Sequence, residues 1–85
     1  MNQKQIGNFI AQKRKEKNLT QMQLAEILGV SNKTISKWEN GNCMPDYSII
    51  KPLCKELGIT VSELMDGEEK DNTPENAEDT RILFL

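Results

Sequence analysis

The residues best suited to binding chemistry lie in one short segment, residues 32–40. Ile35 and Trp38 stand at i, i+3 spacing, which predicts a helix that turns both side chains toward a core. The opposite face then carries amide, hydroxyl and ammonium groups and no acid: Asn32, Lys33, Ser36, Lys37 and Asn40. These groups suit the major groove of DNA, because Asn can bond adenine through two atoms and Lys can reach guanine or a phosphate. A solvated helix face without a ligand is the alternative interpretation.

A second group of candidate residues comes just before this segment. Thr20 and Gln21 begin a predicted helix at about Gln21–Leu28, whose first N–H groups and positive dipole end would point toward a phosphate. The short turn at residues 29–31 predicts a steep angle between the two helices, so that the second one protrudes. The basic run at residues 13–17 could add charge that displaces counterions, with compensation of a helix dipole as the alternative.

Charge is distributed unevenly along the chain. The 85 residues carry a net charge of −2. Residues 1–45 hold seven Lys and Arg against three Glu, a net of +4, whereas residues 46–66 carry −2 and residues 67–85 carry −4. This asymmetry places the part of the chain that suits nucleic acid in its first half.

The composition excludes several classes of site. Histidine is absent, and the two cysteines, Cys43 and Cys54, form no Cys-x-x-Cys pair. We therefore expect no catalytic residue, no metal site and no cofactor, and we interpret the cysteines as a surface thiol and a core residue, with a redox-sensing pair as the alternative. Without a secretory signal or a long apolar stretch, a cytoplasmic protein with no membrane contact by residues 1–66 is expected.

Five short helices are predicted from start and stop signals. Ser or Thr between apolar residues marks three helix starts, at Thr20, Ser31 and Thr60, and Gln23 and Glu63 can complete capping boxes. Glycines at positions 29, 41, 58 and 67 mark helix ends. The predicted helices begin after Asn2 and run to about Lys17, then span about Gln21–Leu28, Asn32–Asn40, Tyr47–Leu57 and Val61–Asp66. Pro52 is predicted to kink the fourth.

The chain changes character after the predicted helices. Residues 1–66 form the predicted domain, with its helix-turn-helix motif at about 20–40. Residues 67–85 are acidic, and we interpret them as a linker or disordered tail. The apolar ending Ile82-Leu83-Phe84-Leu85 has three interpretations. It leads into a further C-terminal region, it is a contact element, or it docks on the domain itself.

Several residues combine into a specific pattern: Leu19-Thr20-Gln21-x-x-Leu24-Ala25-x-x-Leu28-Gly29-Val30-Ser31, then Ile35-Ser36-x-Trp38-Glu39-Asn40-Gly41, then Pro45. With the later Leu57-Gly58-Ile59-x-x-x-Glu63-Leu64, the pattern resembles the phage-repressor and Cro-type (XRE) helix-turn-helix family over about residues 6–66. The resemblance implies an all-α, compact five-helix, lambda-repressor-like domain. It also implies a homodimer that binds double-stranded DNA at a palindromic operator.

The resemblance also implies roles for single residues. Gln21 and Asn40 would contact phosphates, and Arg14 would leave the basic run to form a semi-buried ion pair with Glu39. Recognition positions would be Ser31, Asn32, Lys33, Ser36 and Lys37. The full predicted DNA-binding set is Thr20, Gln21, Ser31, Asn32, Lys33, Thr34, Ser36, Lys37 and Asn40.

Sequence alone therefore predicts a sequence-specific transcriptional regulator, a repressor rather than an enzyme, that reads the major groove with residues 32–40. The alternative function is a protein-interaction module or antitoxin whose C-terminal tail binds a partner protein. One departure from the family concerns the loop Asn42-Cys43-Met44, which lacks basic residues and would add no phosphate contact.

Overall fold

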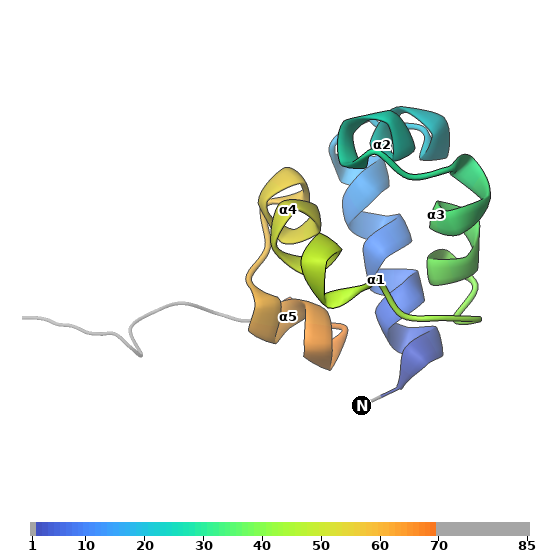
Figure 1. Ribbon diagram of the computed structural model, residues 1–85. Helices are drawn as coiled ribbons and strands as arrows, with labels where there is room; N and C mark the ends of the chain where they lie inside the picture. The colour runs from blue at the N-terminus through green and yellow to red at the C-terminus, as the bar shows by residue number, and fades with distance from the viewer. Residues whose placement is uncertain (1, 70–85) are drawn as a thin grey trace, which may run out of the picture.

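Five α-helices make up the regular structure of residues 2–69, which are the residues that the computed structural model describes (Figure 1). They are α1 (Gln3–Glu16), α2 (Gln21–Leu28), α3 (Asn32–Glu39), α4 (Tyr47–Leu57) and α5 (Val61–Asp66). The predicted all-helical fold is confirmed. The first and third helices each end one residue earlier than predicted, with Lys17 and Asn40 as their C-caps. The interpretations of residues 70–85 lie outside the described residues.

The helix starts are built as their sequences predict. The hydroxyl of Thr20 accepts from the Gln23 N–H at 3.0 Å, and the Gln23 side chain accepts from the Thr20 N–H at 2.8 Å. Thr60 and Glu63 form the same reciprocal box at the start of α5. Since each box satisfies two backbone donors that a helix start would leave unpaired, the start of α2 is fixed locally.

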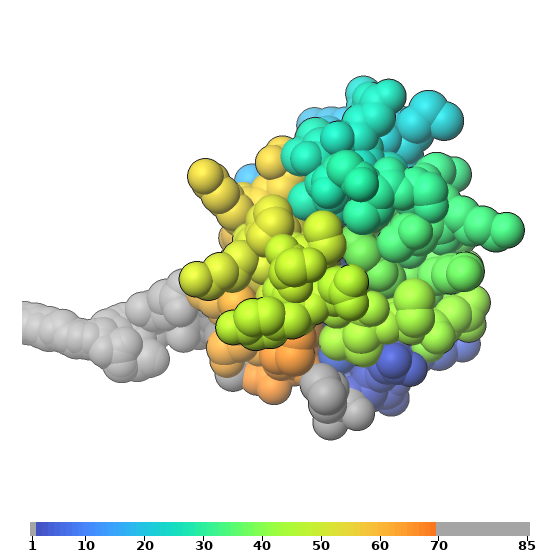
Figure 2. All heavy atoms as spheres, viewed as in Figure 1, coloured from blue at the N-terminus to red at the C-terminus, as the bar shows by residue number. Residues whose placement is uncertain are grey.

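The core draws on all five helices. Fully buried side chains come from each: Ile6, Ile10, Leu24, Ile35, Leu53, Leu57 and Leu64. α1 runs behind the other helices, α3 packs chiefly against α1 and α2, and α4 packs against α5, α1 and α2 (Figure 1). This core holds α2 and α3 as a unit whose outer surfaces adjoin along one side of the molecule (Figure 2).

Pro52 lies within α4, which continues to Leu57. Its ring removes the hydrogen bond that an N–H at this position would give to the Ser48 carbonyl. Both Pro52 and Ser48 are exposed, so water can bond that carbonyl instead. The inward stripe beyond the proline is intact, because Leu53, Cys54 and Leu57 are all buried.

Candidate nucleic-acid interface

The exposed face of α3 carries the donor groups that the sequence places there. Ile35 and Trp38 are 0% and 4% exposed, which confirms the side of the helix that packs inward. Ser36 is half-buried, and its hydroxyl accepts from the Asn40 side chain at 3.3 Å. The remaining predicted residues of this face are all exposed: Asn32, Lys33, Lys37 and Asn40.

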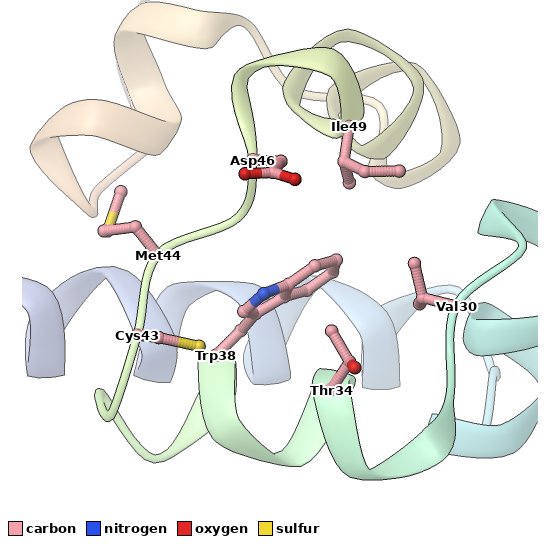
Figure 3. Close-up of a pocket in the computed structure, with 7 residues that line it drawn as sticks. All are labelled: Val30, Thr34, Trp38, Cys43, Met44, Asp46 and Ile49. Atoms are coloured by element: carbon pink, nitrogen blue, oxygen red, sulfur yellow. The ribbon is translucent and has the colours of Figure 1, made fainter.

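Ser31 caps the start of α3 through a hydrogen bond with Thr34. The Ser31 hydroxyl accepts from the Thr34 N–H at 3.1 Å and contacts the Thr34 hydroxyl at 2.9 Å. Ser31 is exposed beside the outer face of α3. Thr34 is half-buried and turns toward a cavity between α3 and α4 (Figure 3).

A buried ion pair joins the end of α1 to the end of α3. Arg14 donates from Nε to one Glu39 oxygen at 2.7 Å and from Nη2 to the other at 3.2 Å. Its third nitrogen donates to the Leu19 carbonyl at 2.7 Å. The Arg14 and Glu39 side chains are 11% and 7% exposed. Because the guanidinium is paired on all three nitrogens and shielded from water, it fixes both helices rather than offering charge to solvent.

Gln21 extends this network to the first residue of α2. Its side-chain amide donates to Glu39 Oε1 at 2.9 Å, the oxygen that Arg14 Nη2 also contacts. The spacing of Gln21 and Glu39 in the sequence gives no sign of this bond, because it depends on the angle between α2 and α3. The amide has a second N–H, so holding the side chain against Glu39 still leaves one donor for a phosphate.

The basic run at residues 13–17 does not form one patch, contrary to the interpretation from sequence. Lys13 is buried and its ammonium pairs with Glu16 at 3.2 Å and Glu69 at 3.0 Å. The hydrogen bonds that this ammonium donates to Glu69 and, with a smaller effect, to Glu16 raise the pKa of Lys13. The Lys17 ammonium lies beside Gly58, where a Cβ would be 3.2 Å from it. Successive residues point about 100° apart on a helix, so adjacent cations in this run meet different neighbours.

Two classes of feature are missing from the described residues. None of the helices within residues 2–69 is long and apolar enough to cross a membrane. The same residues contain no cluster of three or more Cys, Asp or Glu that could hold a metal ion. The candidate site rests on the exposed donors of α3 and on the start of α2.

Comparison with known proteins identifies the fold. A family model described as a helix-turn-helix domain matches residues 7–70. The HTH-type transcriptional activator BcrR of Enterococcus faecalis is 48% identical over 65 residues, which make up 76% of this chain and 32% of that protein. The antitoxin PezA of Streptococcus pneumoniae is 32% identical over 65 residues, or 76% of this chain and 40% of that protein. The chain thus spans about a third to two fifths of the length of these relatives.

A solved structure agrees. The crystal structure of the P22 c2 repressor in complex with a synthetic operator matches with a TM-score of 0.71 and 32% identity, covering 74% of this chain and 96% of that one. The chain therefore belongs to the phage-repressor and Cro-type (XRE) helix-turn-helix family.

Proposed function

We propose that this protein is a sequence-specific DNA-binding transcriptional regulator, a repressor, that inserts α3 in the major groove. The observation that carries the proposal is the exposed, acid-free donor face of α3, which a buried ion pair holds in place from behind. Rigid placement matters because base readout requires each side chain to reach its groove atoms without reorganisation. The P22 c2 repressor, solved with an operator, supports the same use of this fold. Such a function belongs in the cytoplasm.

The residues predicted to contact DNA, on α3 and at the start of α2, divide by chemistry. Asn32, Lys33, Ser36 and Lys37 would read base edges, with Ser31 beside them at the start of the helix. Thr34, although predicted in the DNA-binding set, turns toward the cavity between α3 and α4 and bonds with Ser31. Thr20, Gln21 and Asn40 would contact phosphates, which position a protein on the duplex without reading its sequence. As a homodimer on a palindrome, the protein would place two copies of α3 roughly 34 Å apart.

The test is a binding titration on an operator selected from random-sequence DNA. Replacing Asn32→Ala together with Lys33→Ala is expected to weaken binding at least tenfold and to relax base preference, because each good base contact contributes about 1–3 kcal/mol. Binding should weaken as salt rises, since phosphate contacts release counterions. Fluorescence anisotropy at several salt concentrations measures both effects.

Lys51→Ala is the matched control for this titration. Lys51 is an exposed lysine on α4, so its loss removes the same charge away from the proposed interface. Affinity for the operator should change little. Equal losses in the control and in the α3 variant, or no sequence-selective binding by the parent protein, would refute α3 as the reading element.

An antitoxin is the second candidate, supported by the likeness to PezA. BcrR, an activator by name, is more similar, at 48% identity against 32%, and this favours the regulator. The antitoxin and the regulator differ in the role they give to residues 68–85, so deleting these residues distinguishes the two functions. If deleting them removes a co-purifying protein, they bind a partner; if DNA affinity rises instead, their acidic groups compete with DNA for the basic half of the chain.

A further inference from the structure

A cavity opens on the side of α3 that faces α4. Its volume is about 210 Å³, and Figure 3 shows it between the Trp38 ring of α3 and the beginning of α4. The lining is mainly apolar, with one hydroxyl and one carboxylate: Val30, Thr34, Trp38, Met44, Asp46 and Ile49. Trp38 and Thr34 belong to the helix that carries the proposed reading face, so an occupant of this cavity would lie directly beside that face.

The most exposed large hydrophobic side chain of the described residues stands next to this cavity in the sequence. Tyr47 is 91% exposed and follows Asp46, which lines the cavity. A tyrosine ring buries a large area when it finds a partner, and aromatic rings often anchor interfaces. A two-fold interface uses the same patch on both copies, so it requires a protruding group and its receptor on one patch. Tyr47 and the cavity supply both.

Asp46 adds a polar group that complements tyrosine. It occupies the N-cap position of α4 but makes no side-chain cap hydrogen bond there. Its carboxylate instead lies across the cavity from the Trp38 ring (Figure 3). A carboxylate at the mouth of an apolar cavity disfavours an acidic occupant and can accept a hydrogen bond from a phenol O–H.

We propose that a second copy of this chain docks here, each Tyr47 entering the cavity beside Trp38 of the other copy and donating to Asp46. The proposal deepens the proposed function and rests on it for the effect on operator binding, because a two-fold pair joined beside α3 can match a palindrome. Self-association itself requires no DNA. The interface can therefore be tested separately from operator binding.

The first experiment follows self-association of the full chain without DNA. Trp38 is the chain's one tryptophan, so its emission reports occupation of the cavity. Sedimentation and Trp38 emission should change together as concentration rises, and Tyr47→Ala should weaken association at least tenfold. The association of Tyr47→Phe should be intermediate between that of the parent chain and that of Tyr47→Ala, because phenylalanine keeps the ring and loses the hydroxyl donor. Met22→Ala removes another exposed apolar side chain, 61% exposed on α2, and should leave association unchanged.

A cross-link tests which groups meet. Cys43 also lines the cavity, so Tyr47→Cys should form an intermolecular disulfide with Cys43 of the other copy under mild oxidation, at a protein concentration raised to offset the weaker association expected without the ring. The product has twice the chain mass on a non-reducing gel. Adding Cys43→Ser to Tyr47→Cys should sharply reduce it, whereas Met22→Cys should not form it. A cross-link that persists without Cys43 would place the two Tyr47 positions against each other and overturn the docking geometry.

Other outcomes also overturn the proposal. A chain that stays monomeric at high concentration, or a dimer that Tyr47→Ala leaves intact, excludes this interface. If Phe84→Asp changes Trp38 emission at a dilution where the chain is monomeric, the occupant is the chain's own apolar ending. Association that depends on Tyr47 in a protein that binds no DNA would support the interface while refuting the proposed function.

Discussion

On the side of α3 that faces α1 and α2, charged and amide groups are matched at 2.7–3.2 Å, whereas on the side that faces α4 a cavity of about 210 Å³ remains. The two sides therefore hold the helix differently. The α1 side fixes position and angle through Glu39, and the α4 side leaves apolar surface uncovered beside Trp38. The difference shows how a short helix can be held firmly on one side while a cavity remains on the other.

Removing Glu39 tests the α1 side most severely. Glu39→Ala leaves the Arg14 charge buried with only the Leu19 carbonyl of its three acceptor atoms, and it also removes the acceptor for Gln21. Loss of one partner of a buried pair costs about 3–5 kcal/mol. The expected result is a large fall in the urea midpoint of unfolding, measured by circular dichroism.

The double variant Arg14→Met with Glu39→Leu is the control for that charge. Apolar side chains of similar size remove both charges together, so most of the lost stability should return. An unchanged midpoint in Glu39→Ala would mean that the ion pair does not hold α3. The side of α3 that faces α1 would then hold the helix no more firmly than the side that faces α4.

A second, smaller effect is expected at Gly7, which lies on the side of α3 that faces α1. A Cβ at this position would lie 2.7 Å from the Glu39 carbonyl oxygen and would also meet the Trp38 carbonyl oxygen. These are backbone atoms, so α1 and α3 would have to separate. Overpacking should cost about 1–3 kcal/mol, and the gain of about 1 kcal/mol in helix propensity offsets only part of this, so Gly7→Ala should lower stability by up to about 2 kcal/mol.

Asn8→Ala is the matched control for the glycine. Asn8 is exposed on the same helix, so alanine there gains propensity and contacts nothing new. Its stability should stay the same or rise slightly. If Gly7→Ala is as stable as Asn8→Ala, the close approach of α1 to the end of α3 does not limit the size of the side chain at position 7.

Local signals predicted the helices well, because each cap depends on residues a few positions apart. The capping box of Thr20 and Gln23 and the inward turn of Trp38 follow directly from spacing. The pairing of Arg14 with Glu39 was implied by family resemblance and not by spacing, since 25 residues separate them. The residues proposed to contact DNA remain a prediction.

What the sequence could not predict depends on how helices meet. Lys13 looks like a solvent-facing cation, yet its partner Glu69 lies 56 residues away. Gly7 carries no turn signal, because its importance comes from the backbone of another helix. The cavity is a place where packing is incomplete, and a hydrophobic pattern indicates which side chains turn inward without showing how completely they fill the space.

The two cysteines give the smallest expected effect and compare the α4 side of α3 with the core. Cys43 is half-buried in the cavity lining, and Cys54 is buried on the inward face of α4. Cys43→Ser should change stability by less than about 1 kcal/mol, the usual range away from a packed core. Cys54→Ser should cost more, because it places a hydroxyl among apolar side chains. Urea unfolding of the two variants measures the difference.

Alkylation of the thiols sharpens this last comparison. Burial, with a smaller contribution from Glu63, raises the pKa of Cys54, so its thiolate is scarce as well as covered. Cys43 should therefore be alkylated in the folded protein, and Cys54 only when the core opens. If a second copy covers the cavity, alkylation of Cys43 should also slow as protein concentration rises, while that of Cys54 should not depend on coverage of the cavity. Equal alkylation rates, or equal costs of the two serine substitutions, would mean that the α4 side of α3 is packed like the core and has no surface to offer.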